Sequence, residues 1–489
     1  MRVMFPKKVL RLPRSIPAVF FLVALFVLQS CTVTDESRID HGEVEIHTPG
    51  YPNFHLNTHN EIIPGEGGVL HIDVIIPTQH LYYRKNDDDQ YYSEFSKQIR
   101  IQQAEGEDDD TYHTIHNDII EDTLTTDERD TVGYSDNHRF STYYRLKPGK
   151  YRLSTTISDK HSGKDISRER DITITDLQEH NITLGDIQLK SKSEGGNEFK
   201  VESGYHLNAD FDSLKTNFQL HVDSTLESDS NIYMRLLRFR TDYEPARPPH
   251  YHTPLPGSLI NQGIDYNEPD TVQTVSRELS ILEGVIDIDF ELPRLPEGNY
   301  RVEVESLDLK DENDDDPIYR ARDFAVMHSG FPGANNLETM AKSLVYITRE
   351  EEYEQIMEAV GTDTLRSEFE RFFGRLYSNR NTAKNVIHSY FTRVEEANLL
   401  FSNHKPGWKT DPGMIYILFG QPDHQDHAID GMVWHYYNDS SSQPRQFIFE
   451  RSRNVGRAYP TENYVLHRGR QFDRAYRETV DRWRRGLMH

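Results

Sequence analysis

The sequence contains a single cysteine, Cys31, in 489 residues. A chain with one thiol cannot close an internal disulfide, and it cannot supply the paired cysteines of a zinc finger. The folded parts must therefore be stabilised by packing. Hydrophobic residues make up 36% of the chain and aromatic residues 11%, which is enough for packed cores and argues against wholesale disorder.

The sequence also lacks the short motifs of several enzyme classes. It has no G-x-S-x-G, no H-E-x-x-H, no P-loop and no dinucleotide-binding fingerprint. Two acidic stretches, residues 87–89 and 105–110, do not have the glycine and glutamate spacing of an EF-hand, so solvated loops explain them better than calcium sites. No metal or cofactor is predicted.

Positive charge is scarce in the middle of the chain. The net charge is −25, and residues 32–328 hold 29 basic against 59 acidic side chains. Such a surface repels nucleic acid and anionic lipid headgroups, so no nucleic-acid partner is predicted.

The apolar run near the N-terminus, residues 16–28, is too short for a transmembrane helix. It has 13 residues, whereas a hydrocarbon core of ~30 Å needs about 20. Five cations and no acids precede it: Arg2, Lys7, Lys8, Arg11 and Arg14. A charged start followed by a run of this length is typical of a secretory signal peptide, which we predict for residues 1–30.

The run ends in Leu28-Gln29-Ser30-Cys31, which resembles the lipobox of bacterial lipoproteins. The resemblance implies cleavage before Cys31 and a diacylglyceryl group on its thiol, and acyl chains would hold the protein on a membrane. Thr32 stands where aspartate would imply retention in the inner membrane, so an outer-membrane lipoprotein of the cell envelope is predicted. The alternative is an ordinary signal peptide in which Cys31 is incidental. Residues 31–50 are polar and are predicted to form a tether.

An internal repeat organises the middle of the chain. Residues 146–153 (LKPGKYRL) match residues 295–302 (LPEGNYRV), and the matches continue downstream. A glycine turn followed by a strand that begins with tyrosine is similar to the last two strands of many immunoglobulin-like bacterial surface modules, where the tyrosine hydroxyl ties the turn to the sheet. Two immunoglobulin-like β-sandwiches are therefore predicted, at residues 50–178 and 183–328.

After residue 335 the hydrophobic period becomes helical. Helices are predicted after a capping box at Thr348 and Glu351 and over residues 363–377 and 382–401, with a basic amphipathic helix at 470–487. Strands are predicted at residues 415–419, 432–437 and 446–450. Helices followed by a small antiparallel sheet indicate an α+β domain over residues 335–489.

Between the last long helix and the sheet lies Gly407-Trp408-Lys409-Thr410-Asp411-Pro412-Gly413. Pro412-Gly413 favours a type II turn, and the unbroken apolar run that follows is typical of a central strand. Asp411 precedes a proline, so it is expected to be extended and to cap N–H groups of the turn. Trp408 brings a large apolar ring whose N–H needs a partner.

This stretch resembles the GWxTD-domain proteins, a bacterial family named after these residues, whose biochemical role is unassigned. Upstream, five residues are similar to the family's R…AN…F pattern: Arg393, Glu396, Ala397, Asn398 and Phe401. The family usually has arginine at the position of Pro412. The missing cation weakens any anion-binding role that the resemblance implies.

Two interpretations of the motif are open. In the functional one, Trp408, Lys409 and Asp411 form the floor of a binding site, and Asp423 follows at the end of the predicted strand. In the structural one, Asp411 caps a turn, Trp408 fills a core and Lys409 is solvated. Of the two, we favour the structural interpretation.

A second candidate centre joins Asp411 and Asp423 to His424 and His427, which could support acid–base or metal chemistry. The predicted loop position of these histidines argues against it, because catalytic groups need rigid support. Three histidine pairs elsewhere lack a consistent carboxylate partner and are not predicted to bind metal: His55/His59, His113/His116 and His250/His252. The proline-rich residues 244–257 form either a ligand-facing lip or a crossing between sheets.

The sequence thus predicts a membrane-anchored envelope lipoprotein that is a non-catalytic binding or scaffold protein. Its C-terminal domain is predicted to recognise a protein or glycan partner. The alternative is an envelope hydrolase or metal-dependent enzyme built on Asp411, Asp423, His424 and His427.

Overall fold

The computed structural model describes residues 38–40, 51–63, 67–105, 111–127, 137–177, 182–193, 195–202, 204–222, 230–251, 263–279, 284–310, 317–428, 431–437, 445–451 and 463–488. Apart from Arg38, these residues belong to one compact unit, Ile39–His489. The predicted signal peptide, Cys31 and most of the predicted tether lie outside the described residues. Within those ranges, no helix combines the length and apolarity that crossing a bilayer requires.

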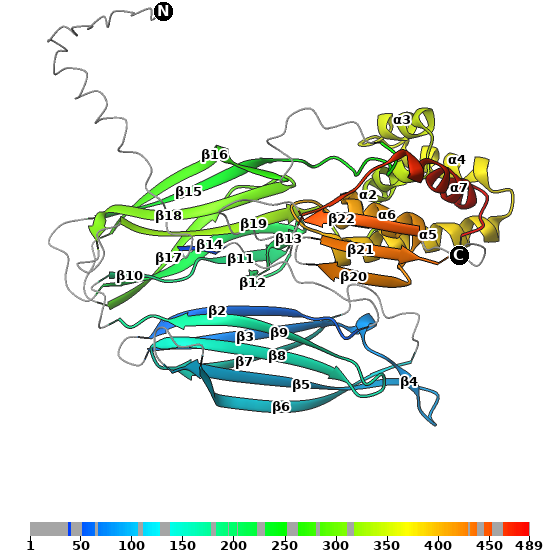
Figure 1. The fold of residues 1–489 in the computed structure, drawn as a ribbon. Coiled ribbons are helices and arrows are strands. Elements are labelled where there is room, and N and C mark those ends of the chain that lie inside the picture. The colour runs from blue at the N-terminus through cyan, green and yellow to red at the C-terminus, as the bar shows by residue number, and fades with distance from the viewer. Residues whose placement is uncertain are drawn as a thin grey trace, which may run out of the picture. The chain divides into compact units, whose positions relative to one another are not determined.

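The first β-sandwich is built from strands between residues 55 and 174 (Figure 1). One sheet has the order β2-β3-β7: β2 (His55–Ile63), β3 (Gly67–Pro77) and β7 (Asn137–Leu146). In the other, β5 (Tyr91–Ala104) pairs with β6 (Tyr112–Thr126) and with β8 (Gly149–Asp159), and β8 pairs with β9 (Asp165–Ile174). The short β4 (Arg84–Lys85) also pairs with β5, and a 3-10 turn, η2 (Thr78–His80), follows β3.

Alternating side chains explain why these residues form a sandwich. In β8, Tyr151, Leu153 and Ile157 are buried, and β5 places Phe95 and Ile99 in the same core. Period-two burial puts one face of each sheet inside and leaves the other to solvent.

The second β-sandwich repeats the plan between residues 182 and 327. One sheet contains β11 (Gln188–Ser193), β14 (Phe211–Val222) and β17 (Gly284–Leu292), with the short β10 (Ile182–Leu184) and β12 (Lys200–Glu202). The other has the order β19-β18-β15-β16: β19 (Pro317–Met327), β18 (Gly298–Lys310), β15 (Ser230–Thr241) and β16 (Ile264–Leu279). Two short strands pair in parallel with β19: β13 (His206–Asn208) and β1 (Ile39–Asp40), the latter within the predicted tether.

Both sandwiches have immunoglobulin-like connections, which confirms the predicted fold class. The sheets β2-β3-β7 and β6-β5-β8-β9 correspond in chain order to β11-β14-β17 and β16-β15-β18-β19. The repeated tyrosines begin equivalent strands. Tyr151 Oη donates to the Lys147 carbonyl at 2.7 Å, and Tyr300 Oη donates to the Pro296 carbonyl at 2.8 Å. These are the tyrosine corners that the repeat predicts.

The C-terminal domain combines helices with a four-stranded antiparallel sheet, which confirms the predicted α+β class (Figure 1). The helices are α2 (Leu337–Ser343), α3 (Glu350–Glu358), α4 (Leu365–Leu376), α5 (Arg380–Phe401), α6 (Asp411–Phe419) and α7 (Asp473–Arg484), with 3-10 turns η5 (Leu344–Tyr346), η6 (Gly407–Lys409) and η7 (Arg470–Phe472). The sheet has the order β20-β21-β22-β23: β20 (His424–Ala428), β21 (Gly431–Tyr436), β22 (Arg445–Arg451) and β23 (Tyr464–Leu466).

Most predicted elements of this domain are confirmed within a few residues, including α4, α5, β21, β22 and α7. The capping box lies one residue later than predicted, because the Arg349 backbone N–H donates to Glu352 Oε2 at 2.8 Å. Strands β20 and β23 were not predicted. The final helix packs on its own domain, with Trp483 fully buried in the core.

One element was predicted wrongly: residues 411–419 form helix α6, not a turn followed by a strand. Thr410 is the N-cap, and its hydroxyl accepts a hydrogen bond from the Gly413 N–H at 3.1 Å. A proline within the first turn is compatible with a helix, because the first N–H groups have no intrahelical partner. Residues 412–418 are buried on every side. A helix with no polar face shows no helical period, so its sequence looks like a buried strand.

Candidate functional site

Helix α6 and the turn before it are packed against α5 with almost no space to spare. A Cβ at Gly407 would lie 1.8 Å from the Ala397 carbonyl oxygen, and one at Gly413 would lie 1.9 Å from the Gly407 carbonyl oxygen. Real Cβ atoms do not approach backbone so closely, so only glycine fits at both positions. The two glycines therefore set the distance between α5 and α6.

Trp408 is buried and held through its backbone. Its N–H donates to Asn398 Oδ1 at 3.1 Å, and its carbonyl accepts from Tyr346 Oη at 2.7 Å. The ring lies edge-on to Tyr346, with 6.4 Å between centroids. The side-chain amide of Asn398 also donates to the Pro332 carbonyl at 3.0 Å. One asparagine thus joins the tryptophan to the segment that enters the domain.

Asp411 forms a bidentate ion pair with Arg468. Arg468 Nη1 donates to Oδ2 at 2.9 Å and Nη2 donates to Oδ1 at 2.5 Å, while the Leu466 N–H donates to Oδ2 at 2.8 Å. Both side chains are mostly buried, with 11% of Asp411 and 17% of Arg468 exposed. Asp411 also lies in the first turn of α6, where the helix dipole favours a negative charge. The carboxylate is therefore fully occupied by contacts within the protein.

The opposite end of α6 is closed by side chains as well. The Ile417 carbonyl accepts a hydrogen bond from Arg393 Nη1 at 3.1 Å, and the Leu418 carbonyl accepts one from Trp483 Nε1 at 3.2 Å. The Arg393 guanidinium also lies over the Trp483 ring, 5.1 Å from its centroid. Carbonyl groups at a buried helix end need such donors, because water cannot reach them.

The remaining residues of the R…AN…F pattern also make internal contacts. Glu396 Oε2 accepts from Tyr416 Oη at 3.0 Å, and burial raises the pKa of Glu396. Phe401 packs against Tyr416 and Trp434, with centroid distances of 5.5 and 5.4 Å. The two patterns that carry the family resemblance therefore describe one packing unit of α5, α6 and the sheet.

The Lys409 side chain extends from the C-terminal domain and contacts the second sandwich. Its Nζ donates to the Tyr243 carbonyl at 3.0 Å and lies 4.0 Å from the centroid of the Tyr243 ring. Its backbone carbonyl accepts from the Ala246 N–H at 2.8 Å. Burial lowers the pKa of Lys409 to about 8. The side chain is thus a docking contact and not the solvated lysine of the structural interpretation.

Buried and partly buried polar pairs continue this contact between the second sandwich and the C-terminal domain. Lys405 Nζ forms an ion pair with Asp242 at 3.0 Å and donates to the Glu244 carbonyl at 2.8 Å. Asn299 Nδ2 donates to the His404 carbonyl at 2.8 Å. Burial lowers the pKa of His404 to about 3, so its ring is neutral at ordinary pH.

The proline-rich segment takes part in the same docking. Arg468 Nη2 donates to the Arg247 carbonyl at 3.2 Å, and the Gly469 N–H donates to the Pro249 carbonyl at 3.0 Å. Its described part, residues 244–251, is therefore a docking strap rather than a lip or a simple crossing. The rest of the segment lies outside the described residues.

The second candidate centre is not assembled as the sequence suggested. Asp423 is exposed and accepts from the Tyr437 N–H at 2.7 Å, while Asp411 is paired with Arg468. His424 lies on strand β20, not in a loop, and its Nε2 is 3.0 Å from Asp426 Oδ1. The backbone of His427 is in the same strand, but its side chain lies outside the described residues.

Asp426 is the centre of the cluster that does form. Its second oxygen is 2.8 Å from His435 Nε2, and hydrogen bonds from His435 and His424 lower the pKa of this exposed carboxyl. Across the described ranges, no group of three or more His, Cys, Asp or Glu side chains is placed to hold a metal ion.

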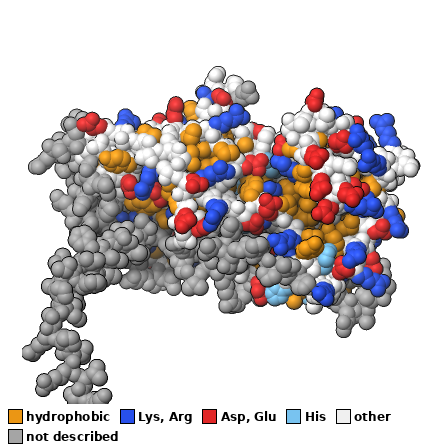
Figure 2. Space-filling model, turned by 90° about the horizontal axis from the view of Figure 1, so that it is seen from above, with side chains coloured by type: hydrophobic (Ala, Val, Ile, Leu, Met, Phe, Trp, Pro, Cys, Tyr) orange, Lys and Arg blue, Asp and Glu red, His pale blue; other side chains and the backbone are white. Residues whose placement is uncertain are grey.

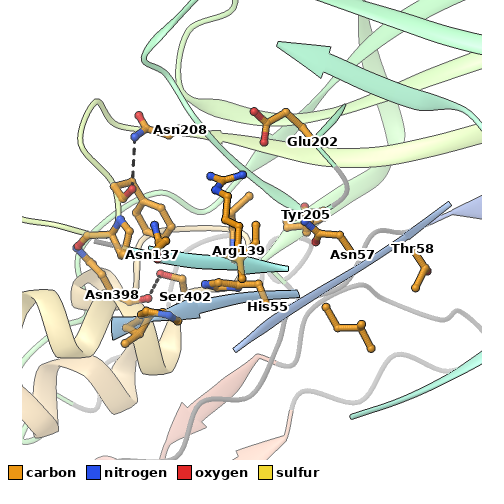
Figure 3. Close-up of a pocket in the computed structure, with 18 of the residues that line it drawn as sticks. His55, Asn57, Thr58, Asn137, Arg139, Glu202, Tyr205, Asn208, Asn398 and Ser402 are labelled. Atoms are coloured by element: carbon orange, nitrogen blue, oxygen red, sulfur yellow. Dashed lines mark hydrogen bonds between the residues drawn. The ribbon is translucent and has the colours of Figure 1, made fainter. Parts of the chain in front are cut away.

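A cavity of about 360 Å³ lies between residues of both sandwiches and the C-terminal domain (Figure 3). Strands β2 and β7 supply His55, Asn57 and Arg139, and the C-terminal domain supplies Asn398 and Ser402. Sequence reasoning missed this site, because its residues are polar side chains scattered over distant strands with no common motif.

Comparison with known proteins agrees with the resemblance. The family model described as GWxTD domain matches residues 312–485. The chain carries a GWxTD domain. No curated protein gives a match. Among solved structures, a red sea bream transglutaminase is similar over 56% of this chain and 31% of that chain, with 8% identity and a TM-score of 0.17.

The solvent-facing side of the GWxTD sheet carries exposed hydrophobic residues. Ile448 in β22 and Val465 in β23 are about 40% exposed, and Tyr437, after β21, is 59% exposed. One face of the molecule shows acidic and basic side chains interspersed with hydrophobic ones (Figure 2).

The Asp411→Asn substitution separates the two interpretations of the motif. It keeps the size of the side chain but leaves the mostly buried Arg468 without its carboxylate. Removing one partner of such a pair is expected to lower the free energy of unfolding by about 3 kcal/mol. Denaturant unfolding measures the loss, with Asp423→Asn, at an exposed carboxylate, as the control within about 1 kcal/mol of the parent. A binding carboxylate with no structural role would instead leave both variants equally stable.

Lys409 is expected to make stability depend on pH above neutrality. Its pKa is about 8 in the folded protein against an ordinary value of 10.5, so between these values the unfolded chain holds the proton that the folded chain has lost. The free energy of unfolding should then rise with pH, by about 1 kcal/mol from about pH 7 to about pH 9. The difference between the parent and Lys409→Met, measured by denaturant unfolding across that range, isolates this effect. A difference that does not vary with pH would contradict it.

Proposed function

We propose that this protein is a lipid-anchored lipoprotein of the bacterial cell envelope, held at the outer membrane through Cys31. In this proposal it is a non-catalytic binding or scaffold protein whose GWxTD domain recognises a protein or glycan partner. The apolar run at residues 16–28 and the Leu28-Gln29-Ser30-Cys31 sequence support the anchor.

The main support for the proposal is that the side chains of the GWxTD motif make their contacts inside the protein. Trp408 is in the core, Thr410 caps α6 and Asp411 is paired with Arg468. A reaction centre needs groups aimed at a substrate, whereas these groups are aimed at their own domain. The motif therefore stabilises the domain. We infer that the residues around the motif recognise the partner.

Docking to the second sandwich supports the scaffold part of the proposal. The Lys405–Asp242 ion pair is partly buried and the Asn299–His404 hydrogen bond is buried, so separating the two domains would leave charged and polar groups unpaired. The GWxTD domain and the second sandwich therefore act as one unit. A truncation that removes residues 329–489 would expose this surface and is a poor test of recognition.

Recognition by the GWxTD domain is tested by photo-crosslinking in cells that make the full chain. A crosslinking amino acid at Tyr437, 59% exposed beside the GWxTD sheet, is expected to give a discrete product with an envelope component. The matched position is Tyr143, 64% exposed on the first sandwich. A product from Tyr143 alone, or from neither position, would count against the GWxTD domain as the recognition module.

The anchor is tested separately through Cys31→Ser. The substitution removes the only thiol that could be acylated, so the protein should move from the membrane fraction to the soluble fraction and lose the mass of the lipid. Membrane fractionation and intact mass measure both effects. Unchanged fractionation and unchanged mass would contradict lipid anchoring without bearing on the crosslinks.

A further inference from the structure

The cavity in Figure 3 has one wall whose polar groups are already used. Asn398 bonds the Pro332 carbonyl and the Trp408 N–H, and Ser402 Oγ donates to the Asn398 carbonyl at 2.6 Å. Asn208 Oδ1 accepts from the Asp210 and Gly330 N–H groups. Hydrogen bonds fix these side chains, so this wall keeps its shape without a ligand.

The wall from the first sandwich is different, because its polar groups are unused. The Arg139 guanidinium has no hydrogen bond or ion pair with any part of the chain that the structure describes. The same holds for the side-chain amides of Asn57 and Gln79. Three groups that can bond a ligand thus line one side of the cavity.

The cavity lining holds more cations than carboxylates: Arg139, Arg170 and Arg322 against Asp40 and Glu202. Arg322 is paired with Asp40 at 3.1 Å. Glu202 accepts from Ser191 Oγ, and burial raises the pKa of this carboxyl, although the hydrogen bond from Ser191 and the charge of Arg139 oppose the rise. The chain as a whole has a net charge of −25, so a cationic position in a cavity is a local exception. The surplus of one cation in the lining favours one negative charge on the ligand.

The side chains around Arg139 indicate what carries that charge. A guanidinium binds a carboxylate through two parallel hydrogen bonds. Each free amide offers a donor and an acceptor, which suits a hydroxyl group that does both. The ring of His206 packs between Tyr205 and Phe331, at 5.2 and 5.6 Å, and gives the cavity an apolar portion. A volume of about 360 Å³ is that of a small-molecule site.

We propose that this cavity binds an acidic sugar residue, with Arg139 bonding its carboxylate and Asn57 and Gln79 bonding its hydroxyls. The inference rests on the proposed binding function and assigns it a ligand class and a place. The ligand site is then the cavity and not the GWxTD motif itself. The GWxTD domain contributes Asn398 and Ser402, whose side chains are fixed by hydrogen bonds.

The test is a titration of the purified chain, without residues 1–31, with D-glucuronate, D-glucose and acetate. Glucuronate is expected to bind one to one, with glucose and acetate each at least about tenfold weaker, because each lacks half of the contacts. Arg139→Gln should weaken glucuronate about tenfold or more and leave glucose unchanged. Arg145→Gln is the matched control, since it lies on the same strand β7 but outside the cavity lining.

Each other outcome would overturn the inference. If glucuronate and glucose bind with equal affinity, the ligand carboxylate has no role. If acetate binds as tightly as glucuronate, the sugar hydroxyls have no role. Loss of binding in Arg145→Gln as well as Arg139→Gln indicates a nonspecific charge effect. No binding of glucuronate rejects the ligand class. If the Tyr437 crosslink persists in those cases, the proposed binding function stands and only the sugar site fails.

Discussion

The ion pair between Asp411 and Arg468 is the contact on which the arrangement of the GWxTD domain depends. It joins the first turn of α6 to the segment after β23, and Arg468 extends the link to the Arg247 carbonyl of the second sandwich. A charge-assisted bidentate pair fixes both position and angle. Both groups are mostly buried, so removing either one would leave an unpaired buried charge and would destabilise the domain. Helix, sheet and sandwich are therefore held at one point.

Each residue of the GWxTD motif has a structural role that explains its type. Gly407 has no room for a Cβ beside the Ala397 carbonyl, and Trp408 fills the core that Asn398 helps to close. Thr410 caps α6 and Asp411 meets Arg468. The variable position, Lys409 in this chain, is the one that reaches the second sandwich. A motif made of packing and capping residues is compatible with many ligands, which is why the motif alone assigns no function.

Sequence reasoning predicted the architecture well and the site poorly, for physical reasons. The sandwiches could be predicted because a repeated glycine turn and tyrosine mark equivalent strands, and the Tyr151 and Tyr300 corners are local features. Helix α6 was missed because a helix buried on all sides has no polar face, although Thr410 and Pro412 are start signals that the turn interpretation overrode. The Asp411–Arg468 pair and the Arg139 cavity join residues far apart in sequence. No local pattern encodes such contacts.

Native-state hydrogen exchange tests most directly whether the GWxTD domain and the second sandwich form one unit. The decisive amides are those of α6 and those at the end of β15, next to the Asp242–Lys405 pair. If the domains are one unit, both sets should open with the same free energy, and both should lose protection together as denaturant rises. Protection of β15 that survives after the α6 amides have exchanged would contradict the account.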